Sequence, residues 1–125
     1  MIIDTDVLIW YLRGNRKAKD VIHENIPFNI SVVTYIELVQ GMLNKEELAK
    51  FIKQLFDWEI NIIQINKEIS TRAMIYVEEY FLSNSMELTD ALIAATCVNN
   101  SEILLTANDK HYKHIPNIQI KKFKL

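Results

Sequence analysis

The chain has 125 residues; half of them are hydrophobic, and only two are glycine and two proline. This composition suits one compact domain over residues 1–125, with enough apolar material for a core. Lysine and arginine number 14 against 16 acidic residues, a net charge of −2. The overall field therefore does not hold the chain to nucleic acid, and such binding needs local basic patches or a bound metal. The single cysteine, Cys97, excludes an internal disulfide framework and a thiolate metal cluster.

Membrane segments are not expected. No apolar run approaches the ~20 residues that span a bilayer. Asp4 and Asp6 also interrupt the first apolar stretch, so the N-terminus has no basic leader followed by a long apolar run. We expect a cytoplasmic protein that does not contact a membrane.

The first third of the chain alternates between short apolar runs and helical patterns. In chain order we expect a strand at residues 1–3, helices at 7–12 and 16–24, a strand at 27–30 and a helix at 32–41. Gly14 is a natural C-terminal cap for the first helix, and Ser31 can cap the helix that follows it.

The remainder of the chain continues this alternation. We expect helices at residues 44–56, 66–82 and 90–99, and strands at 59–65, 103–105 and 118–120. Asn44, Asn66 and Thr89 are the expected N-caps of these helices. Short apolar strands that alternate with helices predict an α/β fold, a three-layer α/β/α sandwich around a mostly parallel sheet. In such sheets ligands bind beyond the carboxyl ends of the strands.

Acidic side chains occur where this rule places ligands. Asp4 directly follows the first strand, Asp6 lies in the first turn of the next helix, and residues 106–109 (Thr-Ala-Asn-Asp) follow a later strand. Glu37 lies in a helix that is apolar on most sides, where a buried charge is costly unless it is paired or binds metal. Asp90 begins an alanine-rich helix that can approach the sheet closely.

Each of these acids has an ordinary explanation when taken alone. Asp4 can serve as a helix N-cap, Asp6 and Asp90 can interact with helix dipoles, and Glu37 can lie on a narrow exposed stripe. Together, however, carboxylates that converge at one sheet edge repel one another unless a cation neutralises them. Oxygen ligands without a His/Cys set favour Mg²⁺ or Mn²⁺. Such a site can polarise a phosphodiester and lower the pKa of a bound water.

The chain resembles the PIN-domain family, and more narrowly its VapC-type toxins of toxin–antitoxin pairs. The resemblance lies in segments that occur in the family's order and together span most of the chain. They are IIDTDVLI at residues 2–9, ISVVTYIEL at 30–38, LTDALIAA at 88–95 and LLTANDKHY at 104–112. The first segment alone is a weak signal, whereas the combination is specific. The resemblance implies a PIN-like nuclease domain that cleaves RNA with Mg²⁺ or Mn²⁺.

The resemblance also assigns roles to residues. It implies that Asp4, Glu37 and Asp90 hold the metal and orient the attacking water. The fourth position is often aspartate in the family, and here both Asn108 and Asp109 are candidates for it. Supporting hydrogen bonds are expected from Thr5, Asp6 and Thr106. Tyr112 stands where phenylalanine is common and is expected to pack rather than react.

Partners follow from the resemblance as well. It implies an RNA substrate, a homodimer, and an antitoxin that inserts a segment into the acidic cleft. Arg13, Arg16 and Lys17 lie just beyond the first acidic segment and could contact RNA phosphates, although a solvated helix face is the simpler interpretation.

Other interpretations of the sequence remain open. A phosphatase resembling the haloacid dehalogenases would use Asp4 as nucleophile and Asp6 as acid/base, but it leaves Glu37 without a role. A phosphoacceptor receiver domain has similar length but needs an aspartate after a central strand, which residues 59–65 do not supply. A PIN fold that only binds a partner is a third alternative, although Asp4, Glu37 and Asp90 are all retained.

Overall fold

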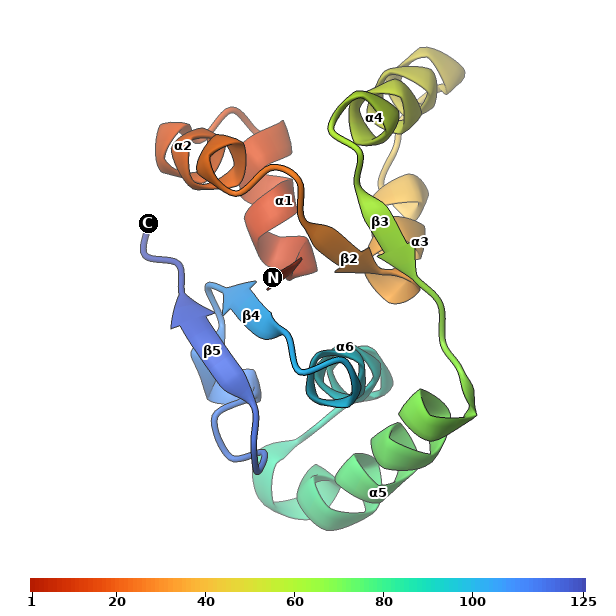
Figure 1. The fold of residues 1–125 in the computed structure, drawn as a ribbon, viewed down its shortest axis with the longest axis vertical. Helices are drawn as coiled ribbons and strands as arrows, with labels where there is room; N and C mark the ends of the chain where they lie inside the picture. Colours follow the sequence, from red (N-terminus) through yellow and green to blue (C-terminus); the bar gives the residue numbers. More distant parts are fainter.

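A five-stranded sheet forms the middle of the computed structural model, which describes residues 1–125 (Figure 1). Its strands are β1 (Ile2–Ile3), β2 (Asn29–Ser31), β3 (Asn61–Ile63), β4 (Ile103–Thr106) and β5 (Gln119–Lys122). The strand order is β3-β2-β1-β4-β5, and every neighbouring pair is parallel. The predicted parallel α/β class is therefore confirmed, and the sheet is parallel throughout. The strand bounds lie within two residues of the expected ones at either end.

Helices connect these strands. They are α1 (Thr5–Leu12), α2 (Arg16–Glu24), α3 (Val32–Gln40), α4 (Lys45–Asp57), α5 (Lys67–Asn84) and α6 (Leu88–Asn99). The expected caps Ser31, Asn44 and Asn66 each accept a hydrogen bond from a backbone N–H of the helix they begin. After α1, Gly14 adopts the left-handed conformation, φ +85°, that its predicted capping role requires.

The predicted cap of the last helix is wrong. Thr89 lies inside α6, and Glu87 is the N-cap residue, without a capping hydrogen bond from its side chain. The helix begins earlier because Glu87 already has the extended backbone of an N-cap, φ −102° and ψ 169°, and its carbonyl accepts from Ala91 N–H. Asp90 is consequently the third residue of the helix rather than the first.

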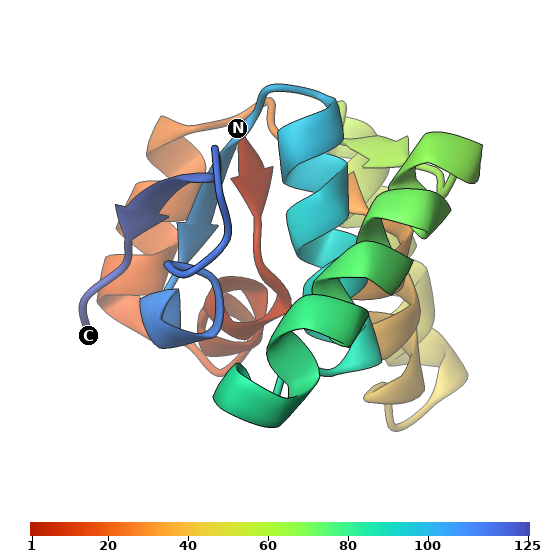
Figure 2. The ribbon, with the colours of Figure 1, turned by 90° about the horizontal axis from the view of Figure 1, so that it is seen from below.

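The helices cover both faces of the sheet, which gives the expected sandwich (Figures 1 and 2). Alternate residues of the central strands point to opposite faces: Ile2 packs with α5 and α6, whereas Ile3 packs with α1, α2 and α4. Helix α6 lies close to the sheet because Ala91, Ala94 and Ala95 are small and buried. No helix combines the length and hydropathy of a membrane-spanning segment.

Candidate functional site

The carboxyl ends of β1 and β4 lie side by side at the centre of the sheet. Ile3 pairs with Leu105 across the two strands, and Asp4 N–H donates to Leu105 O at 2.9 Å. Asp4 and Thr106, the residues that follow this pair, therefore lie close together, and Thr106 Oγ1 donates a hydrogen bond to Asp4 Oδ2 at 2.8 Å. Two segments that are about one hundred positions apart in the sequence form one edge of the candidate site.

Asp4 is the most deeply buried carboxylate of this site, with only 5% of the residue exposed. Its second oxygen, Oδ1, accepts from Thr5 N–H at 2.9 Å. No lysine or arginine forms a salt bridge with Asp4. Burial, with a further contribution from the nearby Asp6 carboxylate, raises the pKa of Asp4 to about 7. The side chain thus holds a charge that the protein itself compensates poorly.

Asp6 ties the loop after β4 to the start of α1. Its Oδ2 accepts from Ala107 N–H and from Asn108 Nδ2, both at 3.0 Å, and its Oδ1 accepts from Val7 N–H at 2.8 Å. Burial raises the pKa of Asp6 despite these donors. The structure therefore places Asp6 next to Asp4 as a hydrogen-bonded support, and it brings the Asn108 amide to the same place.

Glu37 reaches the cluster through a hydroxyl group. Thr5 Oγ1 donates to Glu37 Oε1 at 2.7 Å and lies 3.0 Å from the buried hydroxyl of Thr34. Glu37 is half-buried, so it is neither fully enclosed in the core nor on a plain exposed stripe. Thr5 contacts both acids, because its N–H donates to Asp4 and its hydroxyl donates to Glu37.

Asp90 approaches from α6 and contacts two residues that sequence reasoning did not assign to the site. Tyr112 Oη donates to Asp90 Oδ1 at 3.3 Å, and His111 Nδ1 lies 3.4 Å from Asp90 Oδ2. Tyr112 packs as expected, with 1% of the residue exposed, but its hydroxyl faces the acids. The only feature of the sequence that indicates this contact is the tyrosine hydroxyl, because the resemblance leads one to expect phenylalanine at this position.

Other predicted site residues lie elsewhere. Asp109 belongs to a short 3-10 turn and its Oδ1 is 3.4 Å from Lys122 Nζ on β5, so of the two fourth-position candidates only Asn108 contacts an acid of the cluster. Arg13 directly follows α1, about 12 Å along the axis of that helix from Asp4. Arg16 and Lys17 begin α2, and all three basic residues are exposed. They are outside the cluster.

The donor chemistry of the cluster suits a divalent cation. The side chains that meet here present carboxylate, hydroxyl and amide oxygens, which are the ligands of Mg²⁺ and Mn²⁺. His111 is the only potentially cationic residue that pairs with Asp4, Asp6, Glu37 or Asp90. As the side chains now stand, no three His, Cys, Asp or Glu groups converge on one point. A shared ion therefore requires side-chain rotation, for which half-buried Glu37 and Asp90 have room at the rim.

Comparison with known proteins decides the family. The model of the PIN domain family matches residues 1–118. The chain belongs to the PIN domain family. This membership confirms the resemblance and excludes membership of the haloacid-dehalogenase and receiver-domain families.

Relatives of this PIN domain agree in length and fold. It is 29% identical over 130 residues to Ribonuclease VapC1 of Rickettsia felis, covering 96% of this chain and 93% of the relative. It is 26% identical to a chain of a toxin–antitoxin complex from Klebsiella pneumoniae, with a TM-score of 0.77 and coverage of 99% and 98%. A chain of VapBC2 from Rickettsia felis bound to a promoter DNA fragment shares the fold, with a TM-score of 0.80, coverage of 98% of both chains and 20% identity.

The position of the Asn108 side chain beside the acids of this PIN domain can be tested by introducing a negative charge there. Asn108→Asp places a carboxylate where the amide now donates to Asp6 Oδ2 at 3.0 Å. We expect the melting temperature in EDTA to fall by a few degrees, because a hydrogen bond to a charged group, worth about 2 kcal/mol at most at this exposed position, is replaced by repulsion.

Mn²⁺ should restore the melting temperature of Asn108→Asp by more than it raises that of the wild type. Asn108→Ala is the matched control, since it removes the same hydrogen bond without adding a charge. Equal behaviour of the two variants with and without Mn²⁺, measured by differential scanning fluorimetry, would show that position 108 does not face the cluster.

Proposed function

We propose that this PIN domain is a Mg²⁺- or Mn²⁺-dependent endoribonuclease that hydrolyses RNA phosphodiester bonds. The observation that carries the proposal is the gathering of Asp4, Glu37 and Asp90 at one sheet edge without a lysine or arginine partner. A curated relative of nearly equal length is named a ribonuclease, which supports the same activity. Because its substrate would be cellular RNA, we place the protein in the cytoplasm.

Asp4, Glu37 and Asp90 would hold the cation, and Asn108 would complete the site rather than Asp109. When bound, the cation would polarise the phosphodiester and lower the pKa of a water that attacks it. The chain's own groups set the orientation of the ligands. Thr106 Oγ1 and Thr5 N–H hold the two oxygens of Asp4, while Asp6 holds the Asn108 loop in place.

Glu37 and Asp90 have a second role at the rim of the cluster. Both are partly exposed, unlike Asp4, so a water molecule and a phosphate can reach them. A carboxylate in this position can orient the attacking water and accept its proton. Thr5 Oγ1 holds Glu37 Oε1, which leaves Oε2 as the oxygen that is free to do so.

Nucleophilic phosphatase chemistry fits the same site less well. It would need Asp4 to attack phosphorus, but both Asp4 oxygens accept hydrogen bonds and the residue is 5% exposed. A phosphorus atom with its surrounding oxygens needs more open access to an Asp4 oxygen than a bare cation does, and this residue is almost wholly buried. A binding module without catalysis is the second candidate, and only an activity assay separates it from the nuclease.

RNA would extend from the cluster along the outside of α1. We propose that Arg13, Arg16 and Lys17 contact backbone phosphates at a distance from the cleaved bond, since they lie beyond the far end of this helix, between its last residue and the first turn of α2. Arg13 is partly held in place, with its guanidinium carbon 5.8 Å from the centre of the Trp10 ring. Such contacts would strengthen binding without selecting a sequence.

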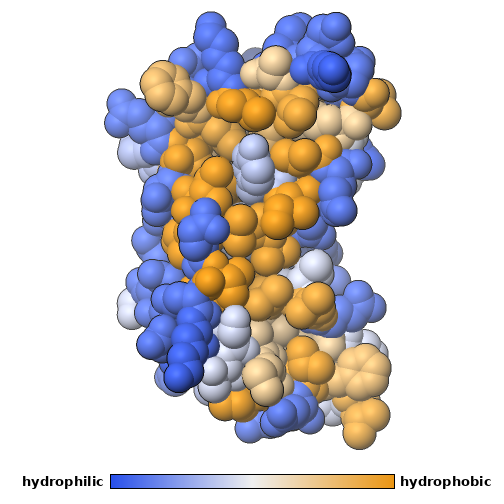
Figure 3. Space-filling view, turned by 90° about the vertical axis from the view of Figure 1, so that its right-hand side faces the viewer, coloured by the Kyte–Doolittle hydropathy of each residue, from blue (hydrophilic) through white to orange (hydrophobic).

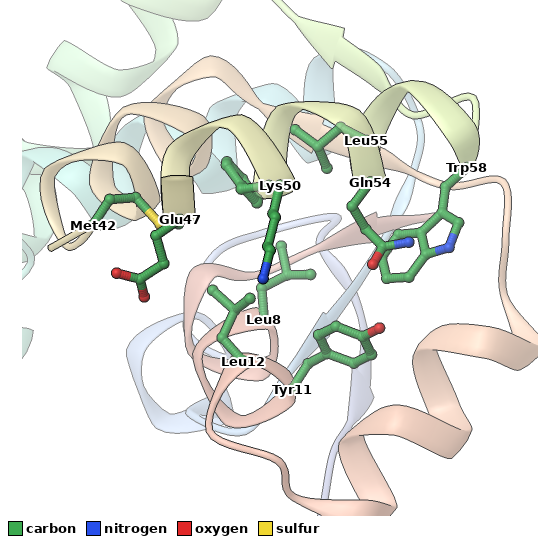
Figure 4. A pocket seen from close by; sticks show the side chains of 10 residues that line it. Leu8, Tyr11, Leu12, Met42, Glu47, Lys50, Gln54, Leu55 and Trp58 are labelled. Atoms are coloured by element: carbon green, nitrogen blue, oxygen red, sulfur yellow. The ribbon is translucent and has the colours of Figure 1, made fainter. Parts of the chain in front are cut away.

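We further propose that the protein is the toxin of a type II toxin–antitoxin pair. The Klebsiella pneumoniae neighbour comes from a toxin–antitoxin complex and has almost the same length. Between α1 and α4 lies a mostly apolar pocket of about 230 Å³, lined in part by Leu8, Tyr11, Phe51 and Trp58 (Figure 4). A segment of the antitoxin with apolar side chains would fit here, next to the charged Glu47 and Lys50.

A homodimer is part of this proposal. Figure 3 shows a face of the molecule, formed by α3, α4 and α5, on which hydrophobic residues run from top to bottom. Exposed apolar side chains on these helices include Ile36 at 50% and Met74 at 62%. Burying such a face between two copies would remove it from water. Light scattering of the purified chain should therefore give twice the monomer mass.

The activity is tested with purified, antitoxin-free protein and a mixed pool of structured RNAs, with Mg²⁺ or Mn²⁺ and with EDTA. We expect discrete cleavage products with metal and none with EDTA. A parallel assay uses a small chromogenic phosphomonoester. Hydrolysis of the phosphomonoester with intact RNA would favour a phosphatase, and no hydrolysis in either assay would favour the binding module.

A further inference from the structure

The hydroxyl of Tyr112 lies between carboxylates that belong to different elements. We infer that Tyr112 is a positioning residue: its hydroxyl fixes the orientation of Asp90, and so its distance from Asp4, before the divalent cation binds. The inference rests on the proposed function, but it concerns a residue to which that proposal gives no role.

The ring of Tyr112 is fixed by packing. The residue is 1% exposed and belongs to the core cluster that also contains Ala91 and Ile115. A phenylalanine ring would fill this space equally well, so packing does not explain the hydroxyl. The hydroxyl instead donates to Asp90 Oδ1 at 3.3 Å, and it lies close enough to Asp4 to lower the pKa of that carboxyl.

The hydroxyl remains a donor under all ordinary conditions. A phenol has an ordinary pKa of about 10, so its hydroxyl is protonated at neutral pH. A neutral donor between two negative groups offsets part of their repulsion without competing with a cation for charge. An ammonium group in the same place would pair with the acids and oppose metal binding.

The hydrogen bond also determines which oxygens of Asp90 face outward. Oδ1 is held by Tyr112, while Oδ2 contacts only the half-exposed His111 ring at 3.4 Å. Oδ2 is therefore the oxygen that can turn to a cation at the rim. Groups that orient metal ligands in this way typically contribute about 10- to 100-fold to metal affinity.

The test compares Mn²⁺ affinity in wild-type protein and in Tyr112→Phe, measured from the electron paramagnetic resonance signal of free Mn²⁺. We expect the dissociation constant to rise about 10-fold or more in Tyr112→Phe. Tyr76→Phe is the matched control, because Tyr76 is also buried, at 6%, in the same core cluster but donates no side-chain hydrogen bond. Its affinity should equal that of the wild type.

A second measurement does not depend on a variant. In protein carrying ¹³C-labelled tyrosine, Mg²⁺ should shift the ring resonance of Tyr112 and leave that of Tyr76 in place. Mn²⁺ binding with equal affinity in wild type and Tyr112→Phe, or an unmoved Tyr112 resonance at saturating Mg²⁺, would overturn the inference alone. Absence of Mn²⁺ binding by the wild type would overturn the proposed function as well.

Discussion

Asp4→Asn is expected to reduce metal-dependent RNA cleavage by at least about 1,000-fold while the chain remains folded. Asn keeps the shape of the side chain but removes the charge that the cation requires. Asp4 is the residue whose loss should matter most, because it is the only one of the proposed ligands that is fully buried and held at both oxygens. Cleavage of a labelled RNA is the measurement, and circular dichroism checks the fold.

The control for this substitution is Asp20→Asn, which makes the same chemical change at an exposed position on α2. It should cleave RNA as the wild type does. Cleavage by Asp4→Asn at more than about one tenth of the wild-type rate, a cost of only about 1.4 kcal/mol, would remove Asp4 from the metal site.

The stability of the metal-free protein should fall as the pH rises from 5 to 8. Burial raises the pKa of Asp4 from an ordinary value of 3.8 to about 7, so the folded state holds the proton over a pH range where the unfolded state has lost it. Asp6 shifts in the same direction. Between pH 5 and pH 8 the ionisation of Asp4 then costs on the order of 3 kcal/mol, which corresponds to roughly 10 °C in melting temperature.

Metal should reverse this loss. At pH 8 saturating Mn²⁺ neutralises the cluster and raises the melting temperature, whereas at pH 5 it has little effect because the acid is protonated. In EDTA, the melting temperature of Asp4→Asn should decline less with rising pH than that of the wild type, and it should be the higher of the two at pH 8. This holds although an Asn side chain cannot accept hydrogen bonds from both Thr5 N–H and Thr106 Oγ1 with its single oxygen. A wild-type melting temperature that is constant or rises from pH 5 to 8 in EDTA would show that Asp4 is not a poorly compensated charge.

The sequence predicted the frame of the site because that frame depends on strand order and local patterns. Asp4 follows β1 and Thr106 ends β4, and adjacency of parallel strands brings such residues together without further detail. The positions of Glu37 and Asp90 near the same strand ends were predictable for similar reasons. Helix α3 comes directly after β2, and the alanine-rich helix α6 packs against the sheet.

The contacts within the site were less predictable because they depend on side-chain torsions and on packing between distant segments. The bond from Thr5 Oγ1 to Glu37 joins positions 32 apart, and that from Tyr112 to Asp90 joins positions 22 apart. Asn108 and Asp109 are adjacent in sequence, yet one turns to Asp6 and the other to Lys122. That difference arises from a single 3-10 turn, which leaves no pattern in the sequence.

The most direct test of the metal site is a crystal structure of the protein with Mn²⁺, using anomalous scattering at the manganese edge. We expect an anomalous peak among the carboxylates of Asp4, Glu37 and Asp90. A peak at any other place, or none among these carboxylates in crystals whose protein binds Mn²⁺ in solution, would contradict it.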